Sequence, residues 1–365
     1  MNSENLDDWT QHLIPKLSGP LKDTGPWHRV EESRSGGWNC LHGDAGENAI
    51  HWFHLSEKGK LKPLDPFSDK RLPVLPNVIS QWVGQGNSVE LLAWRLGSRA
   101  IFRLGSGHFA KVFRKDRHTL MRWEFLKSNS TGNRIQIPEV TDWDSKNKVL
   151  TVKAAPGDSL NAIWKSGVWK NQHLQTIIQI LDMLGTTKNA ADLPEHSIAD
   201  EIEILEKRLQ VFERVLKDPS PKVPDLVKEV ILRLQNLPTS PSVVCHRDFH
   251  DKQVLVSNDQ ITLLDLDLLA KSDPALDAGN ILAHLRLRSL QGLPVPWENC
   301  VASISQWMQS REIQEERLRA WTASTFARLL LIYSRRKRPK ELLHTLESDL
   351  EELLTDTGKW QGVFS

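Results

Sequence analysis

The feature that most constrains the fold is a change in the spacing of apolar residues near Pro156 and Gly157. Before this point, residues 89–114 hold three short apolar runs separated by glycine-containing turns, and such partly alternating runs are typical of β-strands. After it, apolar residues recur every three or four positions, which is typical of amphipathic helices. The Pro-Gly pair marks a hinge between the two patterns. The sequence therefore predicts an α+β fold, with a small sheet lobe followed by a larger, mainly helical lobe.

The first pattern predicts three antiparallel strands that follow one another directly along the chain. They are expected to cover Val89–Leu96, Ala100–Leu104 and Phe109–Arg114. A helix is expected over residues 116–128, and two more short strands should precede the hinge.

Three regions follow from these patterns: residues 1–85, 86–156 and 157–365. The first is an N-terminal extension that contains strand-like pieces and a Pro-rich stretch, residues 60–76, which predicts an extended connection. The extension either caps the sheet lobe or mediates formation of a homodimer, and the sequence leaves both alternatives open.

Composition excludes several classes of protein. The formal net charge of the 365 residues is +1, and the basic cluster at 334–340 is better explained as the end of a helix than as a nucleic-acid site. The cysteines Cys40, Cys245 and Cys300 are too widely spaced to predict a disulfide framework or a zinc site. No run approaches the roughly 20 apolar residues that span a bilayer, and the N-terminus lacks a signal-peptide pattern. We therefore expect a cytoplasmic protein that binds neither nucleic acid nor membranes.

Polar residues gather in one loop between two apolar runs, in the stretch SVVCHRDFHDKQVLV (242–256). This loop carries Asp248 and Gln253, and the next apolar run ends at Asp265, with Asp267 two residues later. Phosphoryl transfer requires a carboxylate that orients the accepting hydroxyl and oxygen ligands for Mg²⁺. One loop and one strand end supply that set of groups, which predicts a phosphotransfer site.

The same positions resemble a known family. The chain is similar to the aminoglycoside phosphotransferase and choline kinase-like family, distant relatives of protein kinases, whose members carry a His-x-Asp loop, a metal-binding amide, a strand ending in Asp and a further Asp-containing segment. The matching positions here are His246-Arg247-Asp248, Gln253, Leu264-Asp265 and the segment SDPALD (272–277).

The resemblance implies a two-lobed protein-kinase-like fold that binds ATP and Mg²⁺. It implies that Asp248 is the catalytic carboxylate and that Asp265 and Gln253 bind the metal. It also implies structural roles for His246, which would orient the loop, and Asp277, which would tie a helix start to that loop.

Three of these assignments leave alternatives open. Gln253 stands where the family has Asn, and its amide oxygen is one methylene further from the backbone, so it is either a functional ligand or a sign of a decayed site. Asp267 either helps to bind metal, bonds the substrate or faces solvent. Asp277 lies beside an expected helix start, which favours a capping role.

The resemblance extends to the sheet lobe. Lys111 in the third strand would contact nucleotide phosphates and pair with Glu124 of the following helix. The turn between the first two strands, Gly97, Ser98 and Arg99, would face the phosphates through backbone amides, unless it is a simple hairpin turn.

Together these residues predict a Mg²⁺-dependent small-molecule kinase, which transfers the γ-phosphate of ATP to a hydroxyl of a small metabolite or antibiotic. The alternative is a pseudokinase that binds nucleotide or a partner; a protein kinase is disfavoured because the Asp-Phe-Gly and Ala-Pro-Glu segments are missing. His250 and Asp251 are expected beside the acceptor. Asp200, Glu201 and Glu203 either line an acidic acceptor cleft or form a solvated helix face.

Overall fold

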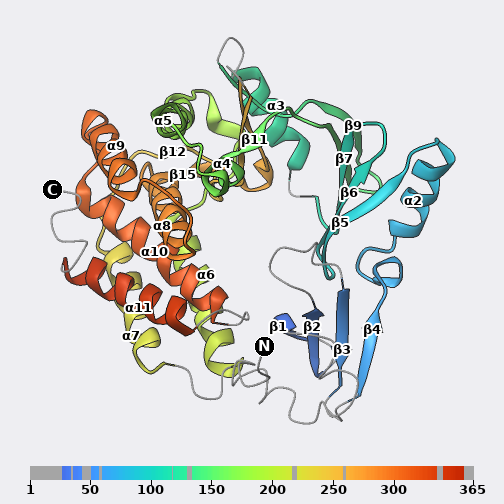
Figure 1. Ribbon diagram of the computed structural model, residues 1–365, viewed down its shortest axis with the longest axis horizontal. Helices are drawn as coiled ribbons and strands as arrows, with labels where there is room; N and C mark the ends of the chain where they lie inside the picture. Colours follow the sequence, from blue (N-terminus) through green and yellow to red (C-terminus); the bar gives the residue numbers. More distant parts are fainter. Residues whose placement is uncertain are drawn as a thin grey trace.

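The computed structural model describes residues 27–33, 36–42, 51–56, 60–116, 118–129, 134–215, 220–257, 260–334 and 340–356. Two antiparallel sheets lie on one side of the molecule and most of the helices on the other, with the short strands that carry the predicted site between them (Figure 1). This arrangement confirms the predicted α+β architecture.

The N-terminal extension contains a sheet of its own. Its elements are β1 (Trp27–Glu32), β2 (Trp38–His42), β3 (His51–Leu55), β4 (Leu61–Leu64), the 3-10 turn η2 (Pro66–Ser68) and α2 (Leu75–Gly84). The four strands pair antiparallel in chain order. The expectation of a merely extended connection over 60–76 is wrong, because this stretch holds β4, η2 and the start of α2. Prolines lie within the first two positions of both helical segments, where a missing N–H costs little.

The second sheet contains the predicted strands. Its elements, with the helix that follows the third strand, are β5 (Val89–Arg95), β6 (Arg99–Leu104), β7 (His108–Phe113), α3 (Thr119–Asn129), β9 (Val140–Asp144) and β10 (Val149–Lys153). The spatial order is β5-β6-β7-β10-β9, and all pairs are antiparallel. The three predicted strands are confirmed to within one residue at each end.

The extension packs against this sheet through a shared hydrophobic core. Trp52, Leu75 and Trp82 are buried together with Trp94 and Phe102 of the second sheet. The Trp52 indole N–H donates to the backbone oxygen of Trp94 at 3.0 Å, and the rings of Trp82 and Phe102 lie 5.4 Å apart. The extension therefore packs against the sheet lobe.

Short strands place the polar loop between the two lobes. They are β8 (Ile135–Gln136), β11 (Asp158–Ser159), β12 (Val243–Cys245), β13 (Val254–Ser257), β14 (Gln260–Leu263) and β15 (Ala270–Ser272), with the 3-10 turn η4 (Leu266–Leu268) after β14. They form one sheet of order β11-β13-β14-β8 and the pair β12-β15. The polar loop connects β12 to β13, so its ends are fixed in two separate sheets.

The helical lobe is built around two helices, α8 and α10. Its elements are α4 (Leu160–Ser166), α5 (Asn171–Thr186), η3 (Ala190–Asp192), α6 (Ile198–Val215), α7 (Lys222–Gln235), α8 (Leu276–Leu290), α9 (Trp297–Ser310), α10 (Glu315–Tyr333) and α11 (Lys340–Thr355). A Cβ at Gly279 of α8 would lie 2.7 Å from the backbone nitrogen of Thr322 in α10, so the two helices approach closely because this residue has no side chain. None of the described helices is long and apolar enough to cross a membrane.

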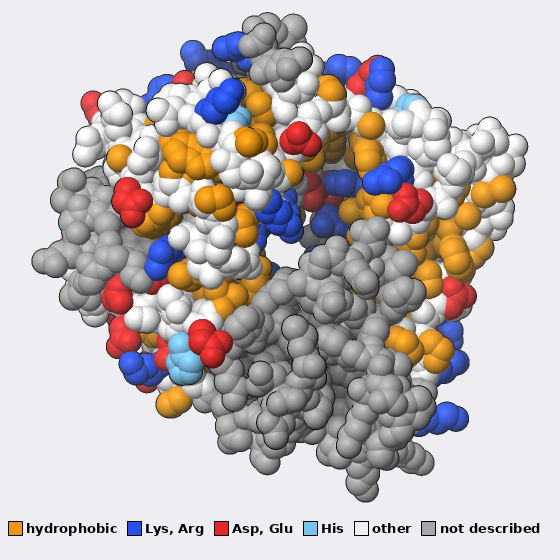
Figure 2. Space-filling view, viewed as in Figure 1, with side chains coloured by type: hydrophobic (Ala, Val, Ile, Leu, Met, Phe, Trp, Pro, Cys, Tyr) orange, Lys and Arg blue, Asp and Glu red, His pale blue; other side chains and the backbone are white. Residues whose placement is uncertain are grey.

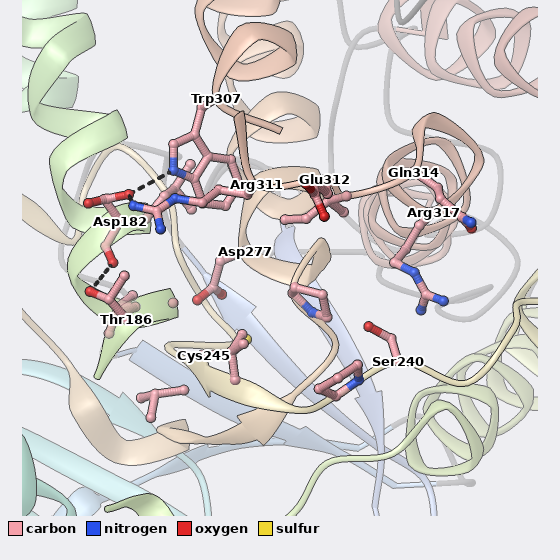
Figure 3. Close-up of a pocket in the computed structure, with 18 of the residues that line it drawn as sticks. Asp182, Thr186, Ser240, Cys245, Asp277, Trp307, Arg311, Glu312, Gln314 and Arg317 are labelled. Carbon is pink, nitrogen blue, oxygen red and sulfur yellow. Dashed lines mark hydrogen bonds and ion pairs between the residues drawn. The ribbon is translucent and has the colours of Figure 1, made fainter. Parts of the chain in front are cut away.

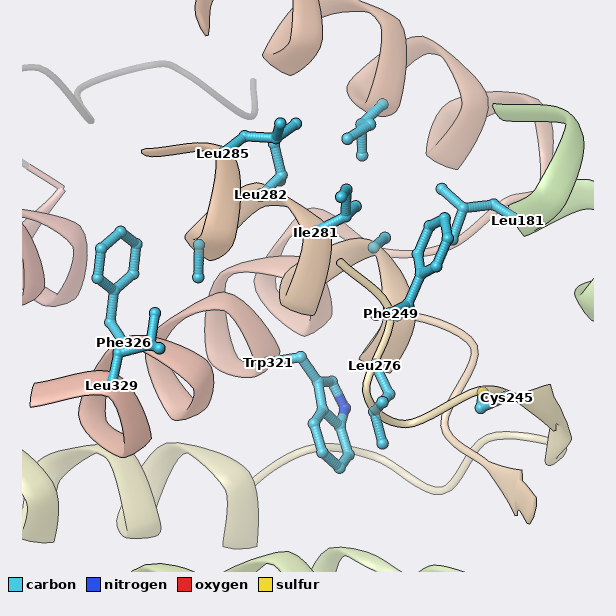
Figure 4. Packing of buried hydrophobic residues seen from close by; sticks show 14 of the residues in the cluster. Leu181, Cys245, Phe249, Leu276, Ile281, Leu282, Leu285, Trp321, Phe326 and Leu329 are labelled. Atoms are coloured by element: carbon cyan, nitrogen blue, oxygen red, sulfur yellow. The ribbon is translucent and has the colours of Figure 1, made fainter. Parts of the chain in front are cut away.

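Phe249 anchors the polar loop in this helical core. Its side chain is fully buried in the same hydrophobic cluster as Ile281 and Leu276 of α8 and Trp321 of α10 (Figure 4). Burying a phenylalanine side chain contributes roughly 1.5–3 kcal/mol, which favours one fixed position for the loop.

Candidate active site

The N-terminal turn of α8 holds the backbone of the polar loop. The carboxylate of Asp277 accepts the N–H of His246 at 2.6 Å and the N–H of Arg247 at 2.8 Å. Asn280, one turn further along α8, donates to the carbonyl of Arg247 at 3.0 Å. Asp277 thus ties the start of α8 to the loop, as expected, but the capping role is wrong, because the cap position is Ala275 and both oxygens of Asp277 accept loop amides. Burial raises the pKa of Asp277, against the opposing effect of His246 and the two amides.

His246 connects the loop to the strand end that carries the next carboxylate. Its Nδ1 accepts the backbone N–H of Asp248 at 3.3 Å, so in the neutral ring the proton resides on Nε2. Nε2 lies 2.7 Å from the carbonyl oxygen of Leu264 and donates to it. The imidazole of His246 thus links Asp248 to the residue immediately before Asp265.

Two residues at the same place have an unfavourable backbone conformation. Arg247 has φ +69° and Asp265 has φ +57°, the left-handed region that side chains other than glycine seldom adopt. Such conformations cost on the order of 1–3 kcal/mol and persist where surrounding contacts enforce them. The hydrogen bonds from Asp277 and Asn280 supply that enforcement at Arg247.

Two carboxylates and two cations meet where β14 ends. The ammonium of Lys111, in the middle of β7, lies 2.7 Å from Asp265 and 3.3 Å from Asp267. The guanidinium of Arg99, at the start of β6, lies 2.9 Å from Asp267 and 3.8 Å from Asp265. The sheet lobe and the helical lobe therefore meet through charge pairs between residues more than 150 positions apart in the sequence.

The electrostatics of the two carboxylates differ. Burial acts to raise the pKa of Asp265, but Lys111 and Arg99 outweigh it and hold this pKa well below its usual range. Burial and the neighbouring negative charge of Asp265 raise the pKa of Asp267, although Lys111 and Arg99 oppose the change. Asp265 is thus the group held most firmly in its charged form, as a cation ligand requires.

The expected pair between Lys111 and Glu124 is wrong. Glu124 is exposed on α3, while Lys111 bonds to the two carboxylates at the opposite lobe. Arg122 of the same helix turns inward instead, where its Nε donates to the carbonyl of Leu269 and its Nη1 to that of Asp267. Arg122 was not identified from the sequence, where the only signal for it was its place beside buried Trp123.

The β5–β6 turn does not present free amides to the cavity. The N–H of Gly97 donates to the carboxylate of Asp69 at 2.7 Å, and the N–H of Ser98 donates to the carbonyl of Arg95 at 2.9 Å. The expected amide contacts of Gly97 and Ser98 with phosphate are therefore wrong, because both donors are already used. Arg99 alone of the three predicted turn residues directs a charged group at the carboxylates.

Gln253 lies at the end of the loop with its amide beside His250. The amide nitrogen is placed 3.3 Å from Nε2 of His250, and the backbone carbonyl accepts the N–H of Leu264 at 2.8 Å. Gln253 does not line the cavity formed by the carboxylates. The structure thus fixes the backbone of Gln253 near the site without directing its side chain into that cavity.

Asp251 has a structural position. It is fully buried, and its carboxylate lies 2.9 Å from Nε of Arg288 and 2.6 Å from the amide nitrogen of Asn161. The expectation that Asp251 lines the acceptor site is therefore wrong. His250 stacks on His284, with ring centroids 4.7 Å apart, and burial lowers its pKa.

The carboxylates open into a cavity of about 270 Å³ between the two lobes. Its lining residues are Arg95, Ser98, Arg99, Phe113, Arg114, Lys115, Thr119, Asp248, Asp265, Asp267 and Leu268. Figure 2 shows Lys, Arg, Asp and Glu side chains gathered around the hollow near the middle of the molecule. The catalytic carboxylate expected from the sequence therefore shares one cavity with both residues of the carboxylate pair.

A larger cavity of about 510 Å³ lies elsewhere in the helical lobe (Figure 3). Asp277 and Cys245 contribute to its wall, together with Trp307 and the ion-paired Asp182 and Arg311. It contains none of the three carboxylates of the smaller cavity. We therefore locate the candidate active site in the smaller cavity, since size alone does not identify chemistry.

The side chains around the smaller cavity suit magnesium. Carboxylate oxygens of Asp265 and Asp267 are hard ligands, and Mg²⁺ commonly takes only one or two ligands from protein and the rest from phosphates and water. No group of three or more His, Cys, Asp or Glu side chains arranged to hold a metal occurs among the described residues. Two carboxylates are as many protein ligands as Mg²⁺ commonly takes.

Comparison with known proteins gives one family match. Residues 166–295 match the model of the phosphotransferase enzyme family, a segment that includes the polar loop, Asp265 and Asp277. No curated protein matches the sequence.

Solved structures match over most of the chain. A thermostable mutant of aminoglycoside phosphotransferase APH(4)-Ia in its apo form has a TM-score of 0.56 and 14% identity, and the match covers 76% of this chain and 98% of that one. The same enzyme in a ternary complex with AMP-PNP and hygromycin B gives 0.55 and 14%, covering 77% and 99%. A choline/ethanolamine kinase family protein from Mesorhizobium loti gives 0.55 and 15%, covering 82% and 98%.

These comparisons confirm the predicted resemblance and fold. The chain has the two-lobed protein-kinase-like fold of aminoglycoside phosphotransferases and choline kinase-like proteins, with an N-terminal extension. At this level of identity the structural likeness concerns the fold alone.

Proposed function

We propose that this protein is an ATP-dependent phosphotransferase that acts on a hydroxyl of a small acceptor. The observation that carries the proposal is the shared cavity of Asp248, Asp265 and Asp267, with Lys111 and Arg99 bonded to the carboxylate pair. The family match over 166–295 and the AMP-PNP complex of a protein with the same fold support it. We assign the nucleotide to the lobe of residues 86–156 and the acceptor to that of residues 157–365.

In this proposal Asp248 accepts a hydrogen bond from the acceptor hydroxyl and aligns its oxygen with the γ-phosphorus. A bond forms from that oxygen to the γ-phosphorus, the bond to the bridging oxygen of ADP breaks, and the hydroxyl proton passes to Asp248. Magnesium, when bound by Asp265 with help from Asp267, would neutralise charge on the phosphate oxygens. Lys111 and Arg99 hold the two carboxylates through ion pairs, and in this proposal they also contact phosphate.

The acids that were candidates for an acidic acceptor cleft have other partners. Glu201 is buried and accepts from Ser324 at 2.6 Å, and it lies 3.1 Å from Arg328. Asp200 bonds to Ser197, and Glu203 pairs with Lys207 along the helix. Glu201 is thus used within the fold, whereas Asp200 and Glu203 are exposed on their helix.

The test is release of ADP from Mg·ATP over a panel of amino alcohols, sugars, nucleosides and aminoglycosides. Asp248→Ala should lower turnover with the active acceptor by roughly 10²–10⁴-fold, the usual contribution of a positioned acid–base group, while nucleotide affinity stays similar. Asp142→Ala, at an exposed carboxylate on β9, is the matched control. Turnover retained by Asp248→Ala would remove Asp248 from the proposed role.

The second candidate is a pseudokinase, and the position of Gln253 favours it. Its side chain lies beside His250 rather than in the carboxylate cavity, where a metal-binding amide would be needed. The discriminating variant is Gln253→Asn, assayed for ADP release. Activity that appears only in this variant supports a decayed site, whereas activity that falls from a measurable wild-type value supports Gln253 as the functional residue.

A further inference from the structure

The turn between β5 and β6 is fixed by a residue of the N-terminal extension. Asp69 is 8% exposed, and its carboxylate accepts the N–H of Gly97 at 2.7 Å and the indole N–H of Trp94 at 3.0 Å. It also accepts the N–H of Arg71 at 2.9 Å. A buried carboxylate with three N–H donors is a firm attachment, because each charge-assisted hydrogen bond is stronger than a neutral one.

The geometry of Gly97 makes this attachment specific. Its φ is +62°, and a Cβ there would lie 2.8 Å from Cδ of Arg71. The turn thus passes close to the Arg71 side chain of the extension, and its left-handed backbone favours glycine, whose amide is directed at Asp69. Figure 1 shows the extension, including α2, next to this edge of the sheet. The extension therefore contacts the turn and helps to fix its conformation.

The side chains of this region, rather than its amides, face the carboxylate cavity. Arg99, Arg114 and Lys115 all line it, and Arg114 forms no ion pair with any described residue. The N–H of Arg114, the residue after β7, donates to the carbonyl of Ser98 at 2.9 Å, which places it beside Arg99 at the start of β6. Guanidinium groups bind phosphate oxygens well because their donors match that geometry.

We propose that the nucleotide phosphates are bound here by the side chains of Arg99 and Arg114, in place of turn amides, and that Asp69 is a positioning residue that holds the turn for this contact. This inference rests on the proposed phosphotransferase function. It assigns to the N-terminal extension a direct part in shaping the nucleotide site, since the turn conformation depends on a carboxylate supplied by the extension.

The test combines nucleotide affinity with backbone hydrogen exchange. In Asp69→Asn, one of the oxygens that accept these N–H groups is replaced by an amide NH₂ group, which donates. The affinity for Mg·ATP should therefore fall by about tenfold, the effect of losing one charge-assisted hydrogen bond. Amide exchange of residues 95–99 should accelerate, while that of β7 stays unchanged, which separates a local effect from general unfolding. Asp65→Asn is the matched control, because Asp65 is exposed and bonds only within its own turn.

A second pair of variants tests the phosphate contact itself. Arg114→Gln should weaken Mg·ATP binding by roughly tenfold or more, whereas Arg103→Gln, an exposed arginine of the same sheet paired with Glu90, should not. Wild-type affinity in both Asp69→Asn and Arg114→Gln would overturn the inference while leaving the kinase proposal intact. A wild-type protein that binds no nucleotide would overturn the proposed function. In that case the role of Asp69 remains testable, because unchanged amide hydrogen exchange of residues 95–99 in Asp69→Asn would refute it.

Discussion

The ammonium of Lys111 lies 2.7 Å from Asp265 and joins the sheet lobe to the carboxylate pair of the helical lobe. The two residues are 154 positions apart in the sequence, and both side chains are mostly buried. A buried carboxylate pair needs such a cation, because two like charges removed from water repel each other strongly. The sequence suggested a different partner, Glu124, which the structure leaves exposed.

Lys111→Met should weaken Mg·ATP binding by roughly 10–100-fold, the range expected for losing a hydrogen bond between charged groups. Methionine keeps a long apolar side chain but leaves Asp265 and Asp267 with Arg99 as their remaining cation. Equilibrium titration with a non-hydrolysable ATP analogue measures the change. Lys153→Met, at an exposed position of β10, serves as the control, and equal affinities of the two variants would contradict the prediction.

Asp277→Asn should lower the free energy of unfolding by about 1–3 kcal/mol, the cost of leaving one buried amide without an acceptor. The asparagine retains a single acceptor oxygen for the two loop amides of His246 and Arg247. Turnover should fall more than nucleotide affinity does, since the loop carries Asp248. Urea denaturation and steady-state kinetics check both effects, with Glu298→Gln in the exposed first turn of α9 as the comparison. A variant as stable as that control would refute the role of Asp277.

Glu201 should make the protein sensitive to acid. Burial acts to raise its pKa, but Arg328 and bonds from His196 and Ser324 outweigh this and lower the pKa to about 2 from an unperturbed 4.5. Because the folded-state pKa is the lower one, its charge stabilises the fold above pH 4.5, and this contribution is lost as pH falls toward 2. Denaturation midpoints measured across this range should fall less steeply in Glu201→Gln than in the wild type. Parallel pH profiles would show that Glu201 contributes nothing to acid sensitivity.

Gly279→Ala should destabilise the contact between α8 and α10. The added methyl would lie 2.7 Å from backbone atoms of Thr322 and Trp321, and such overpacking costs about 1–3 kcal/mol. Gly185→Ala provides a matched control in α5, where a Cβ would have no atom within 4 Å, so alanine should stabilise that helix by roughly 0.5–1 kcal/mol. Opposite shifts in the thermal midpoint are expected, and a gain in stability for Gly279→Ala would contradict the proposed close packing.

Local patterns predicted much of the fold and the identity of the candidate site. Alternating and helical spacing of apolar residues located the strands of the second sheet and the change to helices after Gly157, because these periodicities follow from backbone geometry. The α2 helix was missed because its start lies in a Pro-rich stretch. The polar residues between two apolar runs located the loop with Asp248, since a chain buries apolar residues on both sides of such a loop.

Tertiary structure decided which charges meet. The sequence by itself determined that Asp248, Asp265 and Lys111 lie on a loop, a strand end and a strand, because those positions depend on neighbouring residues alone. It did not determine that Lys111 bonds to Asp265 instead of Glu124, or that Asp69 takes the amide of Gly97. Those pairings depend on which distant segments pack together, and a buried charge or amide bonds to the partner that packing brings within reach.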